Sequence, residues 1–234
     1  DLLRIMTSTK NQWIRVELHC HTRASHDSLV HVDRYLERCK KLGIEKIAIT
    51  DHNEIKAAIA AKALAPDMVI VGEEIQTSRG ELLGYFMSDW VPPRLDPMET
   101  IERLREQGAF ISIPHPFDPY RSKDWEPGDL EALVPYVDAV EIFNARCMGN
   151  KPNLEASFFA VEHDLLMTVG SDAHTLDELG AATLFLPDFQ DKESFKASLP
   201  SAEQMTEHTP FYTHFFSTYA KIFKKFERIF SHQN

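Results

Sequence analysis

Two histidines, His19 and His21, lie two residues apart at the end of a short apolar run that begins at Trp13. In a β-strand, residues i and i+2 point to the same face, so the two imidazoles would share one space. A single His-x-His pair is more often two ordinary histidines than a binding site. Several later apolar runs also end in His, Asp or Glu, however. We therefore interpret the pair as the first part of a metal site.

The residues that follow these apolar runs are imidazoles and carboxylates. They are His19, His21, Asp27, Asp51, His52, Glu74, His115, Asp172 and His174. Nitrogen and carboxylate-oxygen ligands without thiolate suit zinc, manganese or iron. One zinc ion takes about four ligands, so this set is large enough for two or three divalent ions. Two metals about 4 Å apart suit phosphoryl transfer, because they lower the pKa of a shared water and stabilise the charge that develops on phosphorus.

The elements that would position these residues alternate between strands and helices. The predicted strands are 13–18, 46–50, 68–71, 81–87, 109–113, 138–143, 165–169 and 182–186, and the predicted helices are 32–41, 55–64, 98–107, 130–134 and 154–163. This order is typical of an α/β fold with a mostly parallel sheet. In a βα barrel the active site lies at the C-terminal ends of the strands. An open doubly wound sheet draws ligands from fewer strands, so we favour a closed or nearly closed barrel.

Several of these segments resemble the motifs of the PHP family, named for polymerase and histidinol phosphatase. The first motif is similar to His19-Cys20-His21-Thr22 followed by Ser25-His26-Asp27-Ser28, and the later ones are similar to segments 49–53, 72–75, 113–116 and 170–175. The resemblance covers residues 13–187. It implies a distorted (β/α)7 TIM-like barrel that hydrolyses phosphate esters with bound metal ions.

The resemblance also implies which residues hold each metal. The first metal would take His19, His21, Glu74 and Asp172; the second would share Glu74 and take His115; the third would take Asp27, His52 and His174. The implied catalytic residues are His19, His21, Glu74, Asp172 and His174, with a hydroxide that bridges two metals attacking phosphorus. We choose Glu74 over Glu73 because the family's glutamate falls two residues after the glycine.

One position departs from the family pattern. Many members carry a further histidine where this chain has Glu81 or Leu82. Either Glu81 replaces that histidine as a ligand, or the second metal is held by fewer protein groups. The number of metals, two or three, stays open on this point.

Two arginines are candidates for binding the substrate, because guanidinium groups bind phosphate oxygens in bidentate fashion. Arg121 follows the loop after His115, and Arg146 follows another predicted strand. We therefore expect a metal-dependent phosphoric ester hydrolase that acts on a small phosphorylated molecule or a nucleotide. The alternatives are an amidohydrolase-type C–N hydrolase, which also begins with His-x-His, and a non-catalytic metal-binding PHP module that serves a partner.

Composition limits the partners of the protein. The 234 residues carry a formal net charge of −11, which argues against a broad electrostatic grip on long nucleic acid. The cysteines Cys20, Cys39 and Cys147 are widely spaced and odd in number, and neither a signal-peptide layout nor a bilayer-spanning apolar run is present. We expect a cytoplasmic protein with no membrane partner. The sequence does not indicate an oligomeric state.

The chain divides into a barrel, residues 1–199, and a connector with a C-terminal helix, residues 200–234. From Phe215 to Phe230 the apolar residues recur at intervals of three and four, and the lysines fall largely elsewhere. This pattern is typical of an amphipathic helix. We expect the helix to pack on the barrel wall with its apolar stripe, with a role at a membrane surface or a partner as the alternative.

Overall fold

The computed structural model describes residues 12–121 and 125–231, without the side chains of Arg228, Phe230 and Ser231. Residues 1–11 of the predicted barrel segment and residues 232–234 of the predicted C-terminal segment lie outside the described residues. The strands are β1 (Trp13–Glu17), β2 (Lys46–Ile49), β3 (Val69–Gln76), β4 (Glu81–Tyr85), β5 (Phe110–Ile113), β6 (Ala139–Asn144), β7 (Leu166–Gly170), β8 (Ala182–Pro187) and β9 (Glu203–Thr206). The helices are α1 (Val32–Leu42), α2 (Lys56–Leu64), α3 (Pro97–Glu106), α4 (Asp129–Leu133), α5 (Lys151–Glu162), α6 (Lys192–Ser198) and α7 (Thr213–Ser231).

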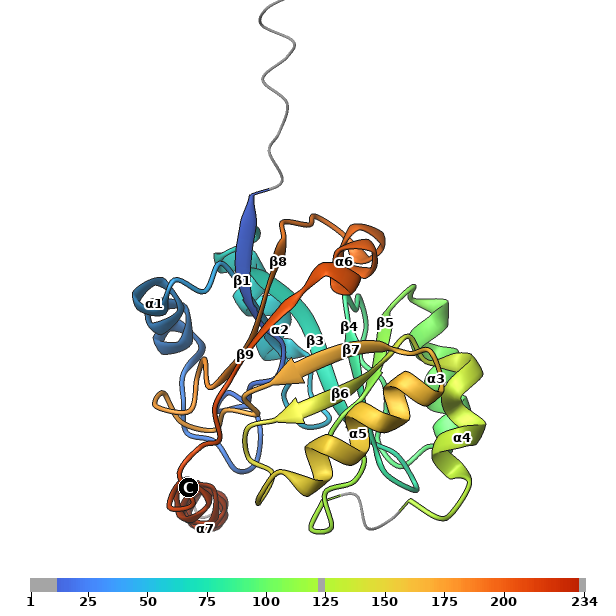
Figure 1. Ribbon diagram of the computed structural model, residues 1–234. Helices are drawn as coiled ribbons and strands as arrows, with labels where there is room; N and C mark the ends of the chain where they lie inside the picture. Colours follow the sequence, from blue (N-terminus) through green and yellow to red (C-terminus); the bar gives the residue numbers. More distant parts are fainter. Residues whose placement is uncertain (1–11, 122–124, 232–234) are drawn as a thin grey trace, which may run out of the picture.

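Within these residues the strands form one sheet in the order β7-β6-β5-β4-β3-β2-β1-β8-β9. The first three strands run parallel, as do β5, β6 and β7, whereas β4 pairs antiparallel with both of its neighbours. The sheet curls into a nearly closed barrel (Figure 1), and a parallel bridge between Cys20 and Ala173 joins the segments that follow β1 and β7. The predicted distorted TIM-like barrel is confirmed, with β4 as its main distortion.

Strand β4 follows β3 through a hairpin, where the pattern of alternating strands and helices would place a helix. Gln76 at the end of β3 pairs with Glu81 at the start of β4. The N-terminal end of β4 therefore lies at the rim that the parallel strands reach with their C-terminal ends. Through this hairpin the Glu81 side chain reaches the rim where the predicted ligands lie.

Apolar side chains fill the space inside the barrel and between the sheet and its helices. Val16, Ile47, Ile49, Phe110 and Leu184 are among the fully buried residues of this core. Helices α1, α2, α3, α5 and α6 lie around the outside of the sheet (Figure 1). No helix in the described part of the chain is long and apolar enough to cross a membrane.

The C-terminal helix contacts the barrel, as expected, but a strand lies within the connector and the contacting face of the helix is not its apolar stripe. Strand β9 lies within the predicted connector and pairs antiparallel with β8. Helix α7 contacts the barrel through Thr213, Ser217 and Ala220, which are buried, while its large apolar side chains from Phe215 to Ile229 are exposed. The face that contacts the barrel is the opposite of the expected one. The reason is that α7 lies beside the polar rim, where small and polar side chains fit better than an apolar stripe.

Candidate metal centre

His19 and His21 extend from the end of β1 and share one face, as their spacing predicts. His19 and His21 are fully buried, with ring centroids 5.1 Å apart. Cys20 points the other way, and its thiol donates to the carbonyl of Ala48 at 3.1 Å. The alternation of a strand therefore separates the two imidazoles from the thiol between them.

The first group of ligands consists of His19, His21, Glu74 and Asp172. The Nε2 atom of His21 lies 3.1 Å from Asp172 Oδ1 and 3.4 Å from Glu74 Oε2. The Nε2 atom of His19 lies 3.4 Å from Glu74 Oε1 and 3.7 Å from Asp172 Oδ1. The structure thus brings together the four residues predicted for the first metal.

The second group contains Glu74, His115 and Glu81. The Nε2 atom of His115 lies 3.0 Å from Glu74 Oε1 and 3.7 Å from Glu81 Oε2. Burial and the neighbouring Glu74 carboxylate raise the pKa of Glu81 to about 7. Of the two possibilities left open by the sequence, this placement favours Glu81 as a ligand in place of the family's histidine.

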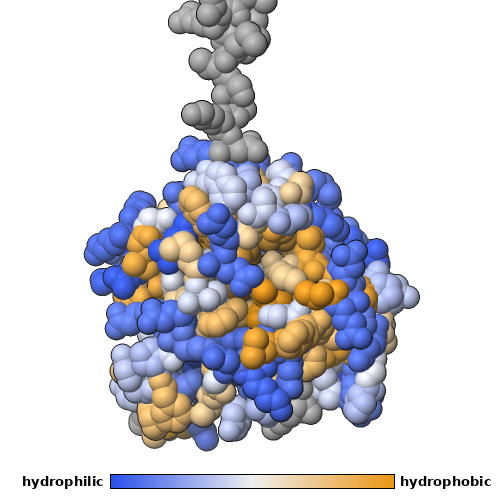
Figure 2. Space-filling model, viewed as in Figure 1, coloured by the Kyte–Doolittle hydropathy of each residue, from blue (hydrophilic) through white to orange (hydrophobic). Residues whose placement is uncertain are grey.

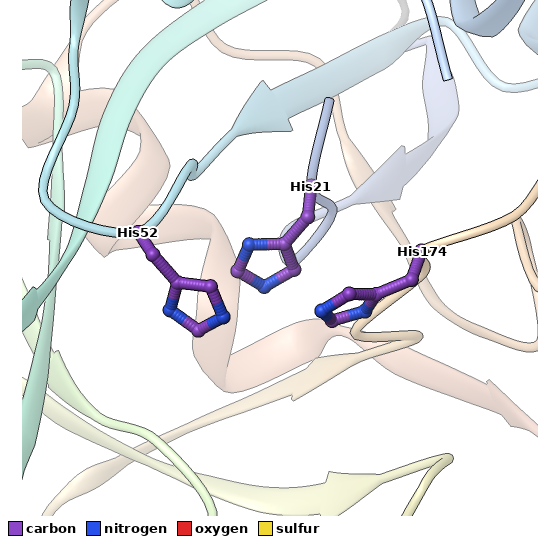
Figure 3. A group of neighbouring side chains, drawn as sticks. All are labelled: His21, His52 and His174. Carbon is purple, nitrogen blue, oxygen red and sulfur yellow. The ribbon is translucent and has the colours of Figure 1, made fainter. Parts of the chain in front are cut away.

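The third group contains Asp27, His52 and His174, with His21 beside them. Asp27 Oδ1 lies 3.2 Å from His174 Nε2, and Asp27 Oδ2 lies 3.5 Å from His52 Nε2. The imidazoles of His21, His52 and His174 come from segments after β1, β2 and β7 and face one shared space (Figure 3). The ring of His21 is 4.2 Å from that of His52 and 4.3 Å from that of His174.

The residues of the three groups fit divalent cations. His19 Nε2, His21 Nε2, Asp27 Oδ1 and Glu74 Oε2 are buried and have no hydrogen-bond partner within the described residues. These four atoms lie 2.9–3.7 Å from the facing nitrogen or oxygen atoms of neighbouring side chains, so together they surround a common space. Each unsatisfied buried polar atom costs about 1–3 kcal/mol, and a cation among them would remove that cost. The donor set of imidazole and carboxylate suits zinc, manganese or iron.

Asp51, one of the nine strand-end candidates, lies behind the ligands and holds a loop. Its carboxylate accepts hydrogen bonds from the Thr22 backbone N–H at 2.6 Å and from the Ser25 hydroxyl at 2.6 Å. The Ser25 hydroxyl in turn lies 3.2 Å from His21 Nδ1. Asp51 therefore fixes the segment that leads from His21 to Asp27.

Glu141 is a site residue that the sequence analysis missed. His19 Nδ1 donates to Glu141 Oε1 at 2.9 Å, and Glu141 Oε2 accepts from the backbone N–H of His115 at 3.0 Å. A carboxylate behind a ligand histidine fixes the ring orientation and raises its basicity. A Cβ on Gly170 would overlap both His19 and Glu141, so this contact needs glycine there. The available signal was that Glu141 is charged although apolar residues flank it on both sides in the sequence.

Two ligand residues have a backbone that non-glycine residues seldom adopt. His115 has φ of 30° and Asp172 has φ of 51°. Left-handed conformations cost free energy for a residue with a Cβ and persist where the surroundings hold them, often at functional sites. The carboxylate of Asp172 is held by Arg121, which contacts it directly. Burial alone would raise the pKa of Asp172, but His19 and Arg121 hold it well below its usual value.

The two predicted substrate-binding arginines both line the cavity above the ligands. Arg121 also donates to Asp118 Oδ2 at 2.7 Å and to Asn144 Oδ1 at 3.0 Å. Arg146 contacts His174 and donates to the Ser217 hydroxyl of α7 at 2.8 Å. Both guanidinium groups are thus anchored by side chains while they face the cavity.

Helix α7 forms one wall of this cavity, which has a volume of about 460 Å³. His214, Ser217, Thr218 and Lys221 are the lining residues from this helix. The Nζ atom of Lys221 lies 3.6 Å from Asp27 Oδ2. These residues were also missed, because nothing in the sequence shows that a helix after the barrel lies over its rim.

Two family models match the chain, a PHP domain over residues 17–109 and a PHP-associated region over residues 150–201. The protein MJ0417 of Methanocaldococcus jannaschii is 38% identical over 172 residues, which cover 72% of this chain and 69% of MJ0417.

Two solved structures share the fold. A two-domain protein from Bacteroides vulgatus, containing a predicted PHP-like metal-dependent phosphoesterase, has a TM-score of 0.69 at 18% identity over 84% of this chain, which spans only 65% of that protein. An amidohydrolase from Chromobacterium violaceum has a TM-score of 0.55 at 15% identity, and the match covers 68% of this chain and 87% of the amidohydrolase.

Proposed function

The chain belongs to the PHP family, and on this basis we propose that it is a metal-dependent hydrolase whose substrate is a phosphate ester of a small molecule or a nucleotide. The observation that carries the proposal is the central place of Glu74, whose carboxylate lies 2.9–3.4 Å from nitrogen atoms of His19, His21, His52 and His115. This cluster lies in a cavity lined by Arg121 and Arg146. The volume of about 460 Å³ lies within the range of about 300–1,000 Å³ of small-molecule sites.

The ligands divide among the cations by the groups described above. His19, His21 and Asp172 would hold one cation, His115 and Glu81 a second, and Asp27, His52 and His174 a third, with Glu74 shared between groups. Bound divalent cations would supply Lewis acidity and would lower the pKa of a coordinated water.

Other residues of the site orient the metal ligands or would bind the substrate. Glu141 holds the ring of His19, and Arg121 holds the carboxylate of Asp172, so these two ligands keep their positions. The charges of Arg121, Arg146 and Lys221 surround the cavity and would bind the phosphate oxygens of the substrate. A cavity of about 460 Å³ has room for a substrate the size of a nucleotide.

The fold likeness to an amidohydrolase keeps C–N hydrolysis as a second candidate. The position of Glu74 on the third strand and of His174 two residues after Asp172 favours the phosphoesterase. A panel of phosphate mono- and diesters, assayed with added manganese, zinc or iron beside amides and a dihydropyrimidine, separates the two. Hydrolysis of the amides alone would contradict the proposal, and bound metal without any turnover would indicate the non-catalytic module.

The adjacent glutamates of β3 provide a matched pair of variants. Glu74→Gln removes the carboxylate shared by the ligand groups, whereas Glu73→Gln changes a buried side chain that accepts from the Val91 backbone N–H at 3.1 Å, outside the site. Because even residues behind metal ligands change affinity or activity by about 10–100-fold, Glu74→Gln should lower activity by at least about 100-fold and reduce bound metal. Glu73→Gln should retain both. Metal content by mass spectrometry and turnover of p-nitrophenyl phosphate measure the two effects, and equal activity in both variants would refute the site.

A further inference from the structure

Helix α7 carries an exposed apolar stripe on the side that faces away from the barrel. The stripe consists of Phe215, Tyr219, Ile222, Phe226 and Ile229, and each of these residues exposes 48–66% of its surface. Apolar side chains gather over this helix in the space-filling view (Figure 2). Monomeric proteins seldom expose a continuous apolar surface of this extent without a partner.

Contacts on the opposite face fix the orientation of the helix. Ser217 and Ala220 are buried against the barrel, and Lys224 donates to the backbone carbonyls of Arg23 and Ser25. Glu227 pairs with Arg23 at 2.6 Å. The helix cannot turn its stripe inward without breaking these contacts, so the stripe is available to another molecule.

The spacing within the stripe indicates a helix as the partner. Its members recur at intervals of four, three, four and three residues, and Tyr212 continues the series before the helix begins. Alternating intervals of three and four place apolar residues at the a and d positions of a heptad, which is the seam through which two helices pack. The 19 residues of α7 span about 28 Å at 1.5 Å per residue, long enough for more than two heptads.

The exposed area suits a dimer. Nine large apolar residues between Phe211 and Ile229 expose 38–66% of their surface within the described chain. At about 200 Å² for a large side chain and about half exposure, the five residues of the stripe offer roughly 500 Å² and the four beside it roughly 400 Å² more. A standard interface buries about 800 Å² per partner. A two-fold axis through the seam would place the same stripe on both sides, because isologous interfaces use one surface twice.

An anionic membrane fits less well. Helices that lie on membranes use free lysines and arginines beside the apolar face. Of the three lysines of α7, Lys221 lies 3.6 Å from Asp27 and Lys224 is held by two backbone carbonyls, which leaves Lys225 as the lysine that faces solvent.

We propose that a second copy of this chain docks on the stripe with its own α7, so that the protein is a dimer joined by a two-helix seam. The seam lies on the outer side of the helix that lines the cavity with Lys221 and holds the loop of Asp27 through Lys224. Dimerisation therefore stabilises one wall of each site. The proposal concerns assembly and does not depend on the reaction that the site performs.

The test is the mass of the full chain in solution, by size exclusion with light scattering over a wide range of concentrations. The wild-type chain should show about twice 26.8 kDa. Phe226→Glu places a carboxylate on each side of the seam, so this variant should show the mass of one chain, as should Ile222→Glu. The matched control is Phe158→Glu, the same substitution at a 71% exposed phenylalanine of α5, which should leave the dimer intact.

Circular dichroism checks that each variant keeps its helix content. A wild-type chain of 26.8 kDa at every concentration would overturn the proposal, and that measurement needs no variant. Equal dissociation of the Phe158→Glu control would overturn it too. A monomer that co-sediments with vesicles of phosphatidylserine and phosphatidylcholine would assign the stripe to a membrane instead.

Discussion

Glu141 shows how one side chain behind the ligands sets the geometry of the site. It accepts from His19 Nδ1 and from the backbone N–H of His115, so it orients residues of two ligand groups at once. The Asn144 side-chain amide also donates to Glu141 Oε2, at 2.9 Å. The carboxylate is therefore fixed by the protein before any cation binds.

Replacement of Glu141 by glutamine should weaken metal binding without removing a ligand. The amide keeps the shape of the side chain but loses the charge that makes His19 a better donor to metal, so affinity should fall about 10–100-fold. Isothermal titration with manganese or zinc measures the change. Glu73→Gln is the control, and an unchanged affinity in Glu141→Gln would show that Glu141 only fills space.

Glu73 predicts a pH dependence of stability. Burial raises its pKa to about 8, whereas an unfolded glutamate titrates near 4.3. Between these values the folded chain holds a proton on Glu73 that the unfolded chain releases. The free energy of unfolding of the wild type therefore falls as pH rises through this range. Glu73→Gln has no such proton, and its stability relative to wild type should grow by about 1.4 kcal/mol per pH unit between about pH 5 and 8. Urea denaturation across this range measures the trend; a constant difference would contradict it.

At the scale of elements, the sequence predicts most strands and helices. It does not predict the direction of β4 or the face with which α7 contacts the barrel. Strand-end ligands such as His19 and His115 could be predicted, because each follows an apolar run. The hairpin that brings Glu81 to the rim could not be predicted, because the apolar pattern of residues 81–85 is the same for a parallel and an antiparallel strand. Periodicity identified the apolar stripe of α7, but it does not say which face meets the barrel.

Helix α7 should contribute to substrate affinity through Lys221. Its ammonium group lines the cavity, and a charge-assisted hydrogen bond contributes about 1.5–3 kcal/mol. We expect Lys221→Gln to raise the KM for p-nitrophenyl phosphate about 10-fold with little change in kcat. Lys225→Gln, at an exposed position outside the lining of the cavity, is the matched control.

Two further measurements separate binding from structure at Lys221. Inhibition by inorganic phosphate should weaken in Lys221→Gln as KM rises, while metal content stays that of the wild type. A fall in bound metal would instead mean that Lys221 acts by placing Asp27, which lies 3.6 Å away.

At the scale of the molecule, the cluster of buried candidate ligands leads us to expect that stability depends on bound metal. A formal charge of −11 and the carboxylates at the rim repel one another, and bound cations offset part of that charge. Binding at 100 times Kd stabilises a fold by about 2.7 kcal/mol, which corresponds to roughly 5–10 °C in a chain of this size.

Removal of metal with EDTA should therefore lower the midpoint of thermal unfolding by about 5–10 °C, and added manganese or zinc should restore it. Differential scanning calorimetry of the chelated and reloaded protein gives both values. Equal midpoints would mean that the ligand groups hold no cation in solution.

The barrel closes between the segments after β1 and β7, where His21 N donates to Ala173 O at 2.8 Å and Ala173 N donates to His19 O at 3.2 Å. His19 and His21 lie on one side of this closure, and Asp172 and His174 lie on the other. A cation held by His21 and Asp172 would thus join the first and last parallel strands of the barrel. Without that cation the closure depends on these backbone hydrogen bonds and on the Tyr35 hydroxyl, which contacts the carbonyls of His21 and Ala173. The supply of metal would then set how readily proteases reach the loops beside the closure.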